Sequence, residues 1–180
     1  MKRPSWVALG WTVAVQSGLA LILVGIWLFL IDPMWLAQNF LQPDLLNQLP
    51  AYLEDYLSKL RSALITTAIL IFVVNILCCA VWHVWGGHSR IDGPGQAARL
   101  WIRWLALLVI GVVLSGAAVY YYLRFDILVR ADALAGLYIT AAILSVVFYF
   151  IGTLFPTEPK LRPGVPLGTL MPPLPGYERG

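Results

Sequence analysis

The chain has 180 residues, of which 60% are apolar and 12% are charged, and its formal net charge is +3. A soluble domain carries about 25% charged residues, so this composition excludes the ordinary soluble class and predicts an integral membrane protein. The small positive charge gives no argument for nucleic acid. Two adjacent cysteines, Cys78 and Cys79, give no disulfide framework.

Four long apolar runs predict four membrane-spanning helices. They cover residues 6–31, 62–85, 100–123 and 133–155. Each run is longer than the roughly 20 residues that a helix needs to cross ~30 Å of hydrocarbon. Lipid offers no hydrogen bonds to the backbone, so such segments must be helical. The predicted fold class is an all-α integral membrane protein, a four-transmembrane-helix bundle over residues 1–155 with an interfacial amphipathic segment between helices 1 and 2, followed by a Pro-rich cytoplasmic tail over residues 156–180.

The segment between the first and second spans, residues 32–61, is predicted to lie outside the hydrocarbon. Prolines divide it, and after Pro50 four apolar residues recur on one helical face: Leu53, Tyr56, Leu57 and Leu60. This spacing predicts an amphipathic helix that lies at the membrane interface or binds a partner. The favoured interpretation is that this segment packs against its own bundle, and a partner-binding or lipid-binding surface is the alternative.

A basic turn over residues 86–99 joins the second and third spans. Four tryptophans flank it, Trp82, Trp85, Trp101 and Trp104. Because tryptophan prefers the headgroup level, they are predicted to mark one membrane interface.

The Pro-rich tail is predicted to be extended or polyproline-like, without a core of its own. Extended segments of this kind dock at little entropic cost. Pro172, Pro173 and Pro175 are therefore candidate partner-binding residues.

The basic residues favour one orientation. With the amino terminus inside, the inner segments hold eight Lys and Arg residues and the outer segments hold four. The inner residues are Lys2, Arg3, Arg90, Arg99, Arg103, Lys160, Arg162 and Arg179, and the outer ones are Lys59, Arg61, Arg124 and Arg130. The positive-inside rule then predicts a multi-pass protein of the bacterial inner (plasma) membrane, with both termini cytoplasmic.

Small residues along the spans predict the faces where helices approach closely. The candidates are Gly18, Gly25, Gly111, Ser115, Ser145 and Gly152. Gln16, Thr66, Thr67 and Asn75 can add hydrogen bonds between helices. We predict that Asn75 faces the bundle and has a structural role.

The predicted spans contain few side chains of the kinds that catalyse reactions, relay protons or bind metals. None has an Asp, Glu, Lys or Arg at its centre, which disfavours proton-coupled transport by this chain alone. Cys79 and His83 share a helix face, but a zinc site needs more ligands than these two. We expect no catalytic residue, no cofactor and no metal. The expected partners are the lipid bilayer and other membrane proteins in a hetero-oligomer, with no nucleic acid.

In its layout of four spans, a long outer first loop and cytoplasmic termini, the chain resembles two groups. They are the four-span immunity proteins against pore-forming colicins and the small membrane subunits of tripartite periplasmic-type transporters. The resemblance covers layout alone, so it assigns no site residue, and the acidic residues expected early in the second helix of the transporter subunit are missing here.

We predict a non-catalytic inner-membrane protein that is a subunit or assembly partner of a larger complex for secretion, conjugation or transport. One alternative is an immunity protein against a pore-forming toxin, and another is a small transporter or channel.

Overall fold

The computed structural model describes residues 6–30, 32–43, 50–87, 94–124, 129–154, 157 and 159–167. Nearly all of these residues are helical, and the extended pairing recorded among them is a single antiparallel bridge between Leu41 and Val129. In chain order the elements are α1 (Trp6–Leu30), α2 (Pro33–Phe40), α4 (Pro50–Gly87), α5 (Pro94–Val119), the π-helical turn η1 (Tyr120–Arg124), α6 (Ala131–Leu154) and the 3-10 helix η2 (Pro159–Gly164).

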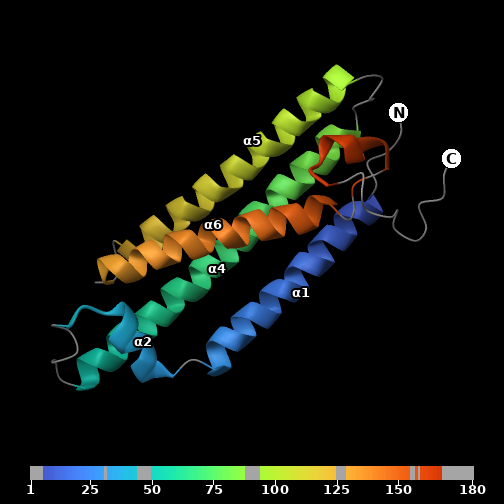
Figure 1. Cartoon of the computed structure of the whole chain (residues 1–180). Helices are drawn as coiled ribbons and strands as arrows, with labels where there is room; N and C mark the ends of the chain where they lie inside the picture. The colour runs from blue at the N-terminus through green and yellow to red at the C-terminus, as the bar shows by residue number, and fades with distance from the viewer. Residues whose placement is uncertain are drawn as a thin grey trace.

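The four long helices α1, α4, α5 and α6 run lengthwise beside one another in alternating directions (Figure 1). α4 packs against the other three, and α5 also packs against α6. α2 lies at one end of the bundle and η2 lies at the other (Figure 1). We call these the α2 end and the η2 end.

Three helical segments in the described part of the chain are long and apolar enough to cross a membrane. They are Leu53–Trp85, Gly95–Leu123 and Ala131–Leu154. α1 is a helix of 25 residues, close to the predicted first span.

α4 differs from the prediction, because the segment 50–61 and the span 62–85 form one continuous helix of 38 residues. Pro50 occupies its first turn, where a missing N–H costs nothing. Between Pro50 and Gly86 there is neither glycine nor proline, so no residue favours a break. α5 likewise starts earlier than predicted, at Pro94.

The apolar face predicted on residues 53–60 packs inside the molecule at the α2 end. Leu60 is fully buried, and Leu53, Tyr56 and Leu57 are partly buried against a cluster that includes four residues of α2 and its end, Leu36, Ala37, Phe40 and Leu41. This segment therefore covers its own bundle rather than lying free at an interface.

Hydrogen bonds at both ends of α2 hold the helix in that position. Asp32 caps the helix, since its side chain accepts a hydrogen bond from the Met34 N–H at 3.0 Å. At the other end of α2, the Arg130 N–H donates to the Phe40 carbonyl at 2.8 Å, next to the Leu41–Val129 bridge. α2 is thereby tied to the start of α6.

The four tryptophans near the η2 end do not share one environment. Trp82 and Trp104 are buried, whereas Trp85 and Trp101 are about half exposed. The buried indoles each donate a hydrogen bond, from Trp82 to the Thr157 hydroxyl at 3.2 Å and from Trp104 to the Thr153 hydroxyl at 2.8 Å. An internal acceptor lets an indole N–H be buried, so these two tryptophans face the interior of the bundle, and the predicted depth of the set at one membrane interface stays a prediction.

The first part of the predicted extended tail is a compact turn, η2, packed on α5. Proline fixes φ near the value that a 3-10 helix needs, so Pro163 fits inside it. A Cβ at Gly164 would lie 2.7 Å from Leu100 Cβ, which makes this a close approach of backbone to α5. Pro172, Pro173 and Pro175 lie outside the described residues.

Candidate functional site

A row of buried polar side chains crosses the bundle at mid-length, and we call it the polar seam. Its members are Thr12 and Gln16 of α1, Asn75 and Cys79 of α4, Ser115 of α5 and Ser145 of α6. In α1 and in α4 the two seam members are four residues apart, which places them on one face of the helix. Along the bundle axis the seam lies between one apolar cluster at the α2 end and another at the η2 end.

One part of the seam joins α4, α5 and α6. The Ser145 hydroxyl donates to Ser115 Oγ at 2.7 Å, and Asn75 Nδ2 donates to Ser145 Oγ at 3.3 Å. Asn75 Nδ2 also lies 2.7 Å from the Ile71 carbonyl one turn earlier. Three helices are therefore linked by two side chain–side chain hydrogen bonds.

The other part of the seam attaches α1 to α4 and α6. Gln16 Nε2 donates to the Phe148 carbonyl at 3.0 Å and to Cys79 Sγ at 3.3 Å. The Thr12 hydroxyl donates to the Gly152 carbonyl at 3.0 Å, and His83 Nε2 lies 3.1 Å from the same oxygen. Two side chains from α1 thus reach backbone carbonyls of α6.

The predicted helix-packing glycines have different surroundings. A Cβ at Gly152 would meet Gln16 Nε2 and would lie 2.7 Å from Cys79 Sγ. A Cβ at Gly111 would lie 3.4 Å from Asn75 Oδ1, an ordinary contact. Gly18 differs from the prediction, since nothing lies within 4 Å of its Cβ position. The surroundings of Gly25 lie outside the described residues.

Several buried polar atoms of the interior have no hydrogen-bond partner among the described residues. They are Gln16 Oε1, Asn75 Oδ1, Thr67 Oγ1 and Tyr149 OH. The seam thus keeps two amide oxygens that can accept a further hydrogen bond. In the described part of the chain, no group of three or more His, Cys, Asp or Glu side chains is placed to hold a metal ion.

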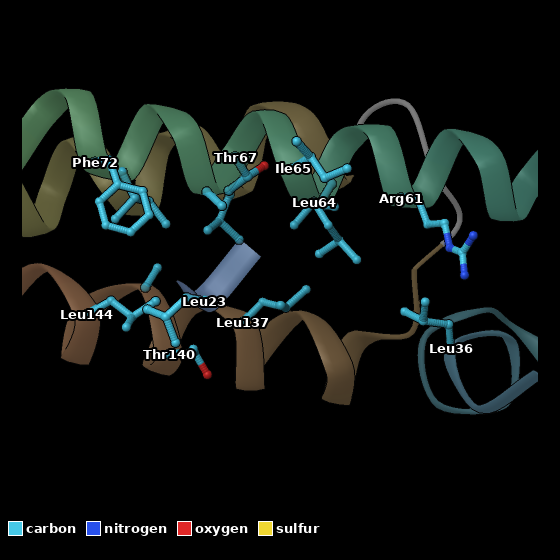
Figure 2. Close-up of a pocket in the computed structure, with 15 residues that line it drawn as sticks. Leu23, Leu36, Arg61, Leu64, Ile65, Thr67, Phe72, Leu137, Thr140 and Leu144 are labelled. Atoms are coloured by element: carbon cyan, nitrogen blue, oxygen red, sulfur yellow. The ribbon is translucent and has the colours of Figure 1, made fainter. Parts of the chain in front are cut away.

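An apolar cavity of about 210 Å³ lies on the α2 side of the seam. Figure 2 shows α4 along one side and α6 along the other, with Leu23 of α1 between them in this view. Arg61 of α4 and Leu36 of α2 lie at one end of the cavity, and Phe72 and Leu144 lie at the opposite end.

The sequence-predicted residues therefore separate into three places. Asn75, Gly111, Ser115 and Ser145 lie where α4, α5 and α6 meet. Gly152 lies where α6 meets α1 and α4. The third place is the α2 end, which holds Leu53, Tyr56, Leu57 and Leu60. The structure does not describe the tail prolines.

Thr12 is the seam member that sequence reasoning missed. The available signal was its spacing of four residues from Gln16, which places two polar side chains on one face of an apolar run. The indole donors of Trp82 and Trp104 were also missed, because their acceptors lie 75 and 49 residues away in sequence, respectively.

In comparisons with protein-family models, curated protein sequences and solved structures, no match to this chain was found. The case for a function therefore rests on the contacts and surfaces described above.

Proposed function

We propose that the protein is a non-catalytic, multi-pass protein of the bacterial inner membrane that serves as a subunit or assembly partner of a larger membrane complex. Secretion, conjugation and transport machines are complexes of this kind. In this proposal α1 is a fourth crossing helix, both termini are cytoplasmic and the α2 end faces outward, as the distribution of basic residues favours.

The observation that carries the proposal is the length of α4. Its 38 residues correspond to about 57 Å of helix, whereas the hydrocarbon of a bilayer is ~30 Å thick. The uncharged residues 62–85 suffice to cross that hydrocarbon. Residues 50–61 then continue beyond it as a projection of the same helix.

This projection has two unlike faces. Its apolar face is covered by α2, and the opposite side carries exposed Glu54, Asp55, Ser58 and Lys59, which we call the outer face of α4. Lys59 and Asp55 form an ion pair at 2.6 Å with more than half of each side chain exposed. Such a surface pair contributes little to stability, so these charges are free to serve recognition of a partner outside the lipid.

The interior supports a binding role rather than a catalytic one. The seam donors bond to side chains or carbonyls of neighbouring helices, so these groups hold the bundle together. None of the six seam residues is Asp, Glu, His, Lys or Arg, and proton relays in membranes are built from such groups. The neighbouring His83 lies 3.1 Å from the Gly152 carbonyl, at the α1 side of the seam.

Photo-crosslinking in cells tests this proposal. A benzophenone amino acid at Ser58, on the outer face of α4, should give one discrete adduct with another protein. The same group at Val113 of α5, which is 62% exposed on an apolar face, serves as the control and should give lipid adducts alone. A chain that purifies in mild detergent as a lone monodisperse species, with no adduct at position 58, would overturn the proposal.

The two free amide oxygens of the seam favour a second candidate, a small transporter or channel. Gln16 Oε1 and Asn75 Oδ1 are buried at mid-depth without a hydrogen-bond partner in the described residues, and such oxygens can take part in binding a polar solute or a cation. Flux through liposomes that contain this chain alone, lost in Asn75→Ala, would support that candidate. An absence of flux through these liposomes would rule out the transporter or channel candidate.

A further inference from the structure

The cavity between α4 and α6 has the depth of one leaflet. Along α4 it runs from Arg61 to Phe72, and eleven residues of helix rise about 17 Å. Half of a ~30 Å hydrocarbon layer is about 15 Å. The cavity therefore begins where the uncharged span begins and ends near the bilayer midplane.

The walls of the cavity fit a hydrocarbon chain. They are formed mainly by leucine, isoleucine, valine and phenylalanine side chains from six elements, α1, α2, α4, α5, η1 and α6. The volume, about 210 Å³, is smaller than the roughly 300 Å³ at which pockets for whole drug-sized ligands begin. It suits one chain of a lipid rather than an entire lipid molecule.

Arg61 supplies the single charge of the lining and lies at the headgroup end (Figure 2). Among the described residues, no hydrogen bond or ion pair is recorded for its guanidinium. A guanidinium at this depth matches a phosphate in charge and in planar hydrogen-bonding geometry.

We propose that this cavity binds one acyl chain of an anionic phospholipid whose phosphate pairs with Arg61. The proposal goes beyond a role in a complex and requires only that the helices cross a membrane. Since lipid tails are as apolar as the cavity walls, burial of the chain does not distinguish one lipid from another. Selectivity comes from the pairing of Arg61 with the phosphate headgroup, whose net charge is negative in phosphatidylglycerol and zero in phosphatidylcholine.

Native mass spectrometry of the purified full chain tests the proposal. The protein is mixed in detergent with equal amounts of palmitoyl-oleoyl-phosphatidylglycerol and the phosphatidylcholine with the same chains. We expect preferential retention of one phosphatidylglycerol. Arg61→Gln should reduce that preference about fivefold, the factor expected for one basic residue near an anionic surface, and Arg61→Lys should keep part of it.

Two further variants separate the cavity from general charge. Lys59→Gln removes the same charge from the exposed outer face of α4, where the lysine side chain is 58% exposed, and should leave retention unchanged. Ala68→Leu narrows the cavity that Ala68 lines and should lower retention while the protein elutes as a folded, monodisperse species. Equal retention of the two lipids by the wild type, an equal loss in Lys59→Gln, or full retention in folded Ala68→Leu would each overturn the proposal.

Discussion

Ser145 of α6 donates its hydroxyl hydrogen to Ser115 of α5 at an Oγ–Oγ distance of 2.7 Å. Both side chains are fully buried, and Ser145 also accepts a hydrogen bond from Asn75 of α4. The two serines thus form the point where three helices are joined by side chains. In a bilayer, where helices gain nothing from excluding water, such bonds and close packing hold a bundle together.

Removing both serine hydroxyls should change the free energy of unfolding by an amount that differs from the sum of the two single effects. In a double-mutant cycle of Ser115→Ala and Ser145→Ala, we expect a coupling free energy of about 0.6 kcal/mol and at most about 1.7 kcal/mol. Reversible unfolding by SDS in mixed micelles measures it. Ser62→Ala, at an exposed position of α4, is the control and should show no coupling with either serine. Additive effects of the serine pair would contradict the observed bond.

Gly152→Ala should destabilise the protein by about 1–3 kcal/mol, the usual cost of overpacking. The added methyl group would meet Gln16 and Cys79, whose Sγ would lie only 2.7 Å away. Gly136→Ala on the same helix is the matched control, because nothing lies within 4 Å of its Cβ position. Its effect should stay within about 0.5 kcal/mol, and equal effects of the two variants in the same SDS titration would show that α1 does not approach Gly152.

A distance between two spin labels on α4 tests whether this helix is continuous. Ser58 and Val81 are both exposed on this helix, and 23 residues of straight helix span about 35 Å. Spin labels carried by non-natural amino acids at these two positions should give one narrow distance distribution near that value. A shorter or broad distribution would indicate a hinge between the outer segment and the span.

The packing of η2 on α5 can be followed by hydrogen exchange. The Val165 N–H donates to the Arg162 carbonyl at 3.0 Å, and Val165 is buried. Gly164→Leu would force a side chain into Leu100 and should speed exchange at Val165 by about tenfold, as expected for ~1–2 kcal/mol of overpacking. Gly95→Leu, at an open position of α5, should leave that exchange rate unchanged.

Reporter fusions test the orientation. Fusions after Gly180 and within residues 87–96 should report cytoplasm, and a fusion near Gln48 should report the outside, as the positive-inside rule predicts. A signal from outside the cytoplasm at the carboxyl terminus would overturn the proposed topology.

The sequence predicted the long helices well, because uninterrupted apolar runs specify them directly. Their bounds were less predictable. The run that begins at Ser62 marks where charges stop, but backbone hydrogen bonding continues back to Pro50. Hydropathy records the lipid boundary of a helix, whereas its end depends on caps and on helix-breaking residues.

Contacts between distant segments could not be predicted in the same way. The sequence pointed to Asn75, but not to Ser145 as its partner 70 residues away. Trp82 and Trp104 carried a strong interfacial signal, and their burial depends on hydroxyls supplied by Thr157 and Thr153. The cavity is likewise formed by side chains from six elements, so no local pattern could reveal it.

In the proposed topology, the unbroken course of α4 connects the two sides of the bilayer by one rigid element. With neither glycine nor proline from Ala51 to Trp85, the helix has no pivot at which a tilt could be absorbed. Trp82, near its far end, holds Thr157 just beyond α6. If the proposed partner tilts the outer end of α4, the tilt reaches the residues that lead into the tail, so a signal would pass through the membrane without any solute crossing it.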